Sequence, residues 1–246
     1  MGFHPMQQRL LRLVCWCHWL DVFGWSLHSY FQLCMIGANQ MLVKEAIEFG
    51  RISKGNTKMP GTSFAIDAFA CNVGSKLAKI KGTPCFGCYA RKLQKLRPSV
   101  DKGYKSNLTK FNNSNIDGWI ASMVFQIDRS KTKYHRWFDS GDLQSVKMFK
   151  AIIDVCLMTP QVKHWLPTQE RAIIEQVKSI PDNLVIRLSG SKITGRPPNY
   201  TNTSTGFDKH GAAYDRECKA RTRGNQCGSC RSCWNRNISN VSYPKH

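Results

Sequence analysis

The stretch that decides the fold class is YHRWFDSGDLQSVKMFKAIIDVCLMTPQVKHWLPTQE, residues 134–170. It alternates short segments of strand character with a segment whose apolar residues recur at helical spacing. The same rhythm extends to both sides. The predicted elements are, in order, a helix over 116–127, a strand over 134–138, a helix over 143–158, a strand over 162–166, a helix over 168–180 and a strand over 183–191. Strands that alternate with helices at this spacing predict an α/β fold with parallel strands, either a partial (β/α) barrel or an open parallel sheet.

Polar residues follow three of the predicted strands, in the turns Asp139–Asp142, Thr168–Glu170 and Ser189–Ser191. Ligands of parallel α/β proteins bind at the carboxyl ends of the strands, so these turns predict a binding site on one edge. The residues that we expect to bind a cofactor there are Ser140, Gly141, Asp142, Thr168 and Ser189. The alternative is that Asp142 and Thr168 only cap the helices that follow them.

The chain is strongly basic, with a net charge of +20 over 246 residues. Such a surface attracts polyanions and indicates a nucleic-acid partner, although solubility alone could account for the charge. Residues 72–110 concentrate it, because they hold ten Lys and Arg residues and a single acid, Asp101.

Eleven cysteines, an odd number, argue against a closed disulfide framework. No clean secretory signal is recognisable, so we expect a reduced, intracellular protein, in which clustered cysteines more often bind metal or do redox work. The candidate metal ligands are Cys71, Cys85, Cys88, Cys218, Cys227, Cys230 and Cys233. We expect nearby positive charge to keep the thiols around Cys85 ionised. Cys156, on the apolar face of a predicted helix, and His164, inside a predicted strand, are expected to be structural.

The spacing of Cys227, Cys230 and Cys233 lets successive thiolates of a turn reach one centre. That pattern suits a 4Fe-4S cluster and it also suits a tetrahedral Zn²⁺ site. The residues leave the choice between iron–sulfur and zinc open.

Residues 1–40 differ from the rest, since they contain no lysine and hold three tryptophans in an apolar run. Arg12, His18 and Asp21 interrupt that run, so we expect no membrane span. We expect this segment to lie outside the core fold, with Met41 as a possible true start; an amphipathic anchor is the alternative. Residues 41–246 are expected to form one α/β domain that ends in a cysteine-rich loop region over 192–246.

Four segments taken together resemble the phage gene product 88 family: PCFGCYARK (84–92), RWFDSGDLQS (136–145), HWLPTQE (164–170) and CGSCRSCWNRNISNVSYPKH (227–246). The resemblance covers most of residues 41–246. It implies a bacteriophage protein that works in the cytoplasm of the bacterial host, and it implies no particular activity.

A more distant similarity is to the radical S-adenosylmethionine enzymes, in which three cysteines spaced C-x-x-x-C-x-x-C hold a 4Fe-4S cluster. By that similarity Cys85 and Cys88 would be two ligands, and Ser140–Asp142 would be the turn that contacts the amino group of S-adenosylmethionine. Lys81 stands where the first cysteine of the motif belongs. The third thiolate would therefore come from Cys71, or from a C-terminal cysteine that folds back.

Two functions follow from these residues. The first is an iron–sulfur enzyme that acts on or near nucleic acid, with S-adenosylmethionine over the strand ends. The second is a non-enzymatic, zinc-stabilised nucleic-acid-binding protein, in which the pair of Cys85 and Cys88 joins that of Cys227 and Cys230. In that protein Lys and Arg would contact phosphates, and Tyr89 and Trp234 would stack on bases.

Overall fold

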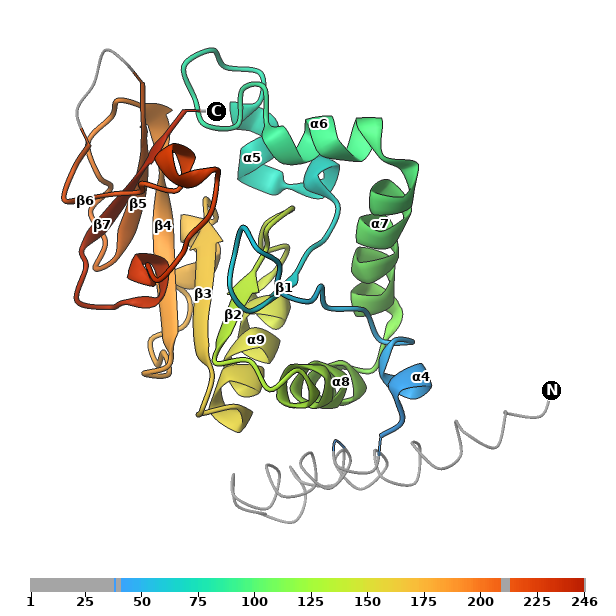
Figure 1. Ribbon diagram of the computed structural model, residues 1–246. Helices are drawn as coiled ribbons and strands as arrows, with labels where there is room; N and C mark the ends of the chain where they lie inside the picture. Colours follow the sequence, from blue (N-terminus) through green and yellow to red (C-terminus); the bar gives the residue numbers. More distant parts are fainter. Residues whose placement is uncertain (1–37, 39–40, 209–212, 246) are drawn as a thin grey trace.

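The computed structural model describes Ala38, residues 41–208 and residues 213–245. Its centre is one seven-stranded sheet in the order β1-β2-β3-β4-β5-β7-β6 (Figure 1). All adjacent strands are parallel, and the sheet is open, with β1 and β6 as its edges. The strands are β1 (Thr62–Phe64), β2 (Tyr134–Trp137), β3 (Lys163–Thr168), β4 (Leu184–Ile193), β5 (Thr203–Phe207), β6 (Arg216–Glu217) and β7 (Asn240–Pro244). The predicted α/β class is confirmed in its open-sheet form.

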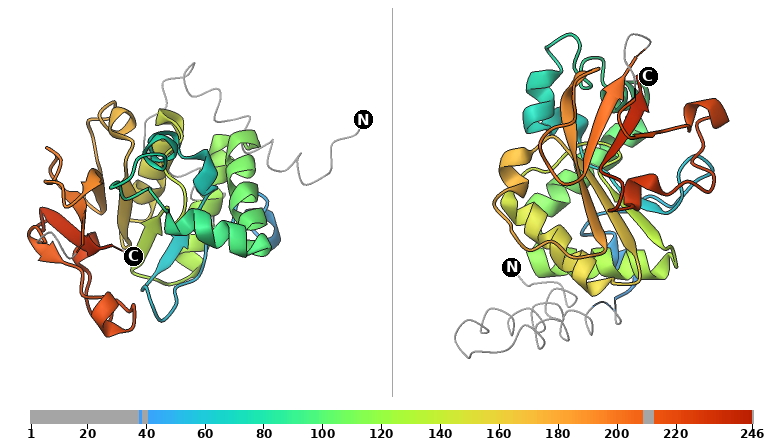
Figure 2. Two further views of the ribbon diagram at one scale, coloured as in Figure 1. Left: turned by 90° about the horizontal axis from the view of Figure 1, so that it is seen from above. Right: turned by 90° about the vertical axis from the view of Figure 1, so that its left-hand side faces the viewer.

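Two different layers cover the two faces of the sheet. Helices α8 and α9 pack on one face, and the C-terminal segment with its short 3-10 turns crosses the other (Figure 2). Helices α5 and α6 lie beyond the end of the sheet where the strands terminate (Figure 1). The helices are α4 (Val43–Ala46), η2 (Ala68–Ala70), α5 (Asn72–Leu77), α6 (Tyr89–Leu96), α7 (Pro98–Asn113), α8 (Ile116–Arg129), α9 (Val146–Met158), α10 (Arg171–Ile174), η3 (Arg221–Arg223) and η4 (Ser232–Trp234).

The apolar core lies between the sheet and helices α8 and α9. Phe64 of β1 packs edge-on against Trp119 of α8 and Trp137 of β2, with ring centroids 5.6 and 6.1 Å apart. Cys156 is buried in the same cluster, as its place on the apolar stripe predicted. These contacts bury the faces that the helical periodicity had identified.

Two histidines of the sheet also belong to the interior. His135 lies 2.8 Å from the Thr62 hydroxyl and His164 lies 2.9 Å from the Thr159 hydroxyl. Burial lowers the pKa of His135, and it lowers the pKa of His164 to about 3. Both rings are therefore neutral structural groups.

The opposite face is held together by one buried arginine, Arg187 of β4. Its guanidinium donates hydrogen bonds to five carbonyl oxygens of the C-terminal half, those of Thr203, Ser232, Cys233, Asn235 and Ile238. Next to it, the Trp234 indole donates to the carbonyl of His135 at 2.9 Å and packs edge-on against Trp165. These contacts fix the C-terminal segment on the sheet.

The prediction of one long loop after residue 191 was wrong, because β5, β6 and β7 lie there. These strands join the parallel ladder, but most of their buried side chains are polar instead of apolar. The Thr203 hydroxyl donates to the Asn240 side chain at 2.9 Å, and the hydroxyls of Thr205 and Ser242 are 2.8 Å apart. Hydrophobic periodicity cannot detect strands whose buried side chains are polar.

The predicted helix over 168–180 shrinks to α10, Arg171–Ile174. Thr168 still belongs to β3, and Glu170, with φ −86° and ψ 64°, has a non-helical backbone, so the helix begins only at Arg171. Ile173, Val177 and Ile180 pack against the core even though the helix ends before the last two.

No helix in the described part of the chain combines the length and the apolar character that crossing a bilayer requires. The expectations for residues 1–40 fall outside the described residues, apart from Ala38, which is buried in the core cluster.

Candidate functional site

The turn Asp139–Asp142 follows β2 at the carboxyl edge of the sheet and depends on a glycine. Gly141 has a φ of 82°, and a Cβ there would lie 2.3 Å from Cγ1 and 2.9 Å from the carbonyl oxygen of Ile66. The Ile66 N–H donates to the Ser140 carbonyl at 3.0 Å, so the turn is pressed against the segment after β1. Only glycine combines the left-handed conformation with this approach.

Asp142 is a buried carboxylate, 7% exposed. It accepts hydrogen bonds from the Thr168 hydroxyl at 2.6 Å and from the backbone N–H groups of Gln169 and Leu143 at 2.8 Å each. These bonds favour the charged form, but burial outweighs them and, with the nearby charge of Glu170, raises the pKa of Asp142 to about 7. The carboxyl group is therefore close to its titration point at neutral pH.

The helix-cap interpretation of the two turns was wrong. The residue before α9 is Ser145, whose hydroxyl accepts from the Met148 N–H at 3.1 Å, and the residue before α10 is Glu170. Asp142 and Thr168 instead bond to each other across the ends of β2 and β3.

The other predicted cofactor-binding residues are arranged differently. Thr168 joins Asp142, whereas the Ser189 hydroxyl lies 3.1 Å from that of Ser204 on β5. Glu170, which the sequence did not single out beyond its place in the turn, accepts from the Val73 N–H of α5 at 2.8 Å. It ties the strand edge to the cysteine-bearing segment.

Two sulfurs of the N-terminal cysteines lie around one point of α5. A Cβ at Gly74, the buried residue of α5, would lie 3.6 Å from the Sγ atoms of both Cys71 and Cys85. Cys85 and Cys88 share a tight turn, closed by a hydrogen bond from the Cys88 N–H to the Cys85 carbonyl at 3.1 Å with Gly87 at a φ of 70°. The absence of a side chain at Gly74 thus leaves space where the thiols converge.

The electrostatics of this group differ from the expectation. Burial raises the pKa of Cys71 well above its ordinary range and that of Cys85 to about 11. The charges of Asp142 and of neighbouring thiolates raise both further, and Arg91 lowers them only in part. The bare thiols are therefore protonated at neutral pH, and ionising them requires a cationic centre.

The C-terminal cysteines form a second group. Burial raises the pKa of Cys227, and the charges of Cys218 and Cys230 raise it further. Burial also raises the pKa of Cys233 to about 12, and the charge of Cys218 adds to this rise. The Cys227 N–H donates to the Lys58 carbonyl at 2.8 Å, in the loop before β1. Hydrogen bonds from Ser232 and Arg223 outweigh burial and lower the pKa of Cys230.

The seven candidate ligands thus fall into two groups: Cys71, Cys85 and Cys88 at the carboxyl edge, and Cys218, Cys227, Cys230 and Cys233 in the segment across the far face of the sheet (Figure 2). As the side chains stand, no three Cys, His, Asp or Glu residues of the described chain are arranged to hold a metal ion. The thiols of each group are close to one another without forming a finished coordination sphere.

The aromatic residues expected to stack on bases divide in the same way. Tyr89 is 63% exposed beside the first cysteine group, whereas Trp234 is 4% exposed, with its ring packed against Trp165 of the sheet. Trp234 is a structural residue, so its predicted stacking role was wrong.

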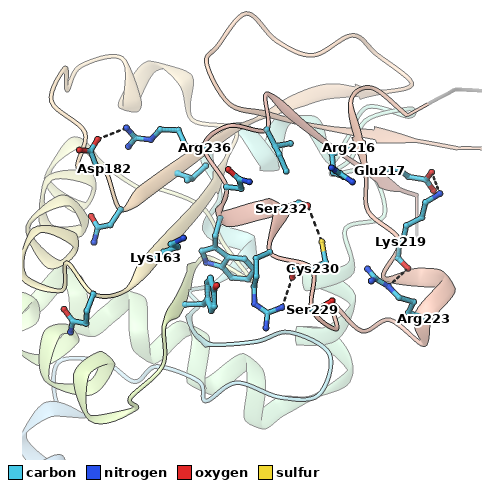
Figure 3. Close-up of a pocket in the computed structure, with 18 of the residues that line it drawn as sticks. Lys163, Asp182, Arg216, Glu217, Lys219, Arg223, Ser229, Cys230, Ser232 and Arg236 are labelled. Carbon is cyan, nitrogen blue, oxygen red and sulfur yellow. Dashed lines mark hydrogen bonds and ion pairs between the residues drawn. The ribbon is translucent and has the colours of Figure 1, made fainter.

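A feature that the sequence reasoning missed is a cavity of about 910 Å³ along the C-terminal segment (Figure 3). Basic side chains from β3, β6, η3 and the residues around η4 line it. The one available signal was the density of Arg and Lys between 216 and 236.

A protein-family model described as gene product 88 matches residues 44–236 of this chain. No curated protein and no solved structure matches it.

Proposed function

The chain belongs to the gene product 88 family of bacteriophage proteins, and from that premise we propose that it is a phage iron–sulfur protein that acts on or near nucleic acid. Cys71, Cys85 and Cys88 would hold a 4Fe-4S cluster at the carboxyl edge of the sheet. The observation that carries the proposal is that the Cys71 and Cys85 sulfurs lie around one point beside Gly74, close enough to Asp142 for its charge to act on both thiols.

Three arguments support a cluster at this place. Thiolates are its usual ligands, and three of them leave one iron open to a further ligand. Gly74 keeps the junction of two sulfurs clear of side chains. A cationic centre would also reverse the high pKa values of Cys71 and Cys85, releasing protons as it binds.

S-adenosylmethionine is the ligand that we propose for the open position. Asp142, in the turn after β2, would supply negative charge to its amino group. When bound, the cluster would supply one-electron chemistry, and the chain's own residues would bind and orient the ligand.

The C-terminal cysteines support a second candidate, a zinc-stabilised nucleic-acid-binding protein. Four thiols are the complement of a tetrahedral Zn²⁺ site. The grouping of Cys227 and Cys230 with Cys218 and Cys233, and not with Cys85 and Cys88, favours a zinc site within the C-terminal segment over one that pairs distant cysteines.

The test is to purify the full chain without oxygen and to measure iron, acid-labile sulfide, zinc and visible absorption. We expect Cys85→Ser to lose iron and sulfide, Cys230→Ser to keep them, and Cys156→Ala, the core control, to keep all metal. A protein without iron and sulfide, or a Cys85→Ser variant that retains both, would contradict the iron–sulfur proposal. A protein with zinc alone, lost in Cys230→Ser, would favour the second candidate.

A further inference from the structure

The cavity along the C-terminal segment is markedly basic. It is lined by six cationic side chains, Lys163, Arg216, Lys219, Arg223, Arg231 and Arg236, against two carboxylates, Asp182 and Glu217. Both carboxylates are already neutralised, Glu217 by Lys219 and Asp182 by Arg236 at 2.9 Å. Within the described chain, the other four cations have no carboxylate partner.

The cations face the hollow from both sides. Figure 3 shows Lys163 and Arg236 on one side and Arg216, Lys219 and Arg223 on the other. They come from elements far apart in the sequence, which the parallel pairing of β6 with β7 and the packing of η4 on β3 and β4 bring together. A positive cleft with protein on both sides concentrates its field on an anion that enters it.

One cation of the cavity is held rigidly. The Arg231 guanidinium donates to the carbonyls of Gly228 and Cys230, at 2.6 and 2.8 Å, and lies over the Tyr134 ring, 5.0 Å from its centroid. Its Nε is buried without a hydrogen-bond partner. A fixed, planar guanidinium stacked on an aromatic ring is a surface on which a nucleobase can stack.

We propose that this cavity, the C-terminal groove, binds single-stranded nucleic acid, with Lys163, Arg216 and Arg223 on the phosphates and the Arg231 guanidinium beside a base. Its volume of about 910 Å³ suits a short stretch of a nucleic-acid strand. The inference rests on the nucleic-acid partner of the proposed function and assigns the surface that binds it.

The test measures binding of the full chain to a fluorescein-labelled 20-nucleotide oligothymidylate by anisotropy, from 50 to 300 mM KCl. Three phosphate contacts on a single strand give a slope of log K against log salt of about −2. Lys163→Gln with Arg216→Gln removes two exposed cations for which no hydrogen bond or ion pair holds the side chain. We expect this double variant to bind about tenfold more weakly at 100 mM salt, with a slope smaller in magnitude by about 1.4.

The matched control is Lys79→Gln with Lys102→Gln, two exposed lysines of the basic stretch 72–110. It changes the net charge equally, and we expect binding within twofold of the parent protein. Equal losses in both double variants would overturn the groove, as would tighter binding of a duplex of the same length, equal competition by polyglutamate, or no binding at all. Failure here with iron and sulfide present refutes the groove alone, whereas groove binding by an iron-free protein refutes the cluster alone.

Discussion

Gly74→Ala is the substitution that most directly tests whether the N-terminal cysteines gather around a metal. It adds one methyl group where two sulfurs meet. The new Cβ would lie 3.6 Å from the Sγ atoms of Cys71 and Cys85 and 3.0 Å from the Cβ of Cys71. Only the last contact is tight, so the metal-free protein can accept the methyl with a shift of a few tenths of an ångström.

Opposite effects are expected on folding and on metal binding. Replacing glycine by alanine inside a helix is favourable by about 1 kcal/mol, and the tight contact with Cys71 offsets part of that gain. The unfolding free energy of the metal-free protein should therefore change by less than about 1 kcal/mol. A cluster whose irons are bonded to the two sulfurs at about 2.3 Å would meet the methyl, and overpacking of about 1–3 kcal/mol weakens binding roughly 5- to 150-fold.

The assay is iron and sulfide per chain after anaerobic reconstitution at limiting iron, beside urea unfolding of the metal-free protein. Gly103→Ala in α7 is the matched control, because nothing lies within 4 Å of its new Cβ. We expect Gly103→Ala to keep full iron and Gly74→Ala to lose most of it at similar stability. Full iron in Gly74→Ala would refute the reasoning, since a metal held by Cys71 and Cys85 could not then use the space beside Gly74.

Three further outcomes follow from the geometry, each measured by urea unfolding. Gly141→Ala should lower the unfolding free energy by about 2–4 kcal/mol, because the new side chain is strained in the left-handed conformation and overlaps Ile66. The control Gly82→Ala, with a φ of 85° and open space at its Cβ, should lower it by about 1 kcal/mol. Equal losses in the two variants would contradict the overlap. Arg187→Met should lower the unfolding free energy by more than about 3 kcal/mol, because five buried carbonyls lose their donor. Proteolysis of this variant should cut the C-terminal segment first. A change below about 1 kcal/mol would show that the guanidinium does not hold that segment. The pKa of His164 is about 3 in the folded chain, below its usual 6.5, so the contribution of the neutral ring to the unfolding free energy is intact above pH 6.5 and falls as the pH drops toward 3. From pH 7 to pH 4 the unfolding free energy should fall by about 3 kcal/mol through this group. His164→Gln should remove that part of the pH dependence.

Local periodicity was sufficient to predict the half of the sheet that carries apolar faces. The stripe of α8 and the strand at β2 follow from residue spacing alone, and the strand-end turns could be placed because parallel strands end on one edge. The C-terminal strands could not be read in this way, since Thr203, Thr205 and Ser242 are buried by bonding to polar partners in neighbouring strands. Their burial depends on the assembled sheet, which no window of sequence contains.

The candidate site shows the same division. Motif spacing identified Cys85, Cys88 and the C-terminal cysteines, but it could not decide which thiols are neighbours, because that depends on the sheet order. Gly74 carried no signal at all, since a glycine in a short helix acquires meaning only when two sulfurs are found beside it. The direction of the pKa shifts of Cys71 and Cys85 could not be predicted from the sequence either. Burial raises both pKa values by more than Arg91 lowers them, and burial is a property of the folded chain.

Strand β4 connects the two regions to which functions are proposed here. In its middle, Arg187 gathers the carbonyls of the segment that forms one wall of the C-terminal groove. At its carboxyl end, the Ile193 N–H donates to the carbonyl of Gly82 at 2.8 Å, in the loop that leads to Cys85. The groove and the first cysteine group are therefore positioned by two parts of one strand, although the two cysteine groups lie apart. A strand of nucleic acid in the groove and a ligand at the carboxyl edge would be held in a fixed relation by β4, which is the geometry that chemistry on a bound polymer requires.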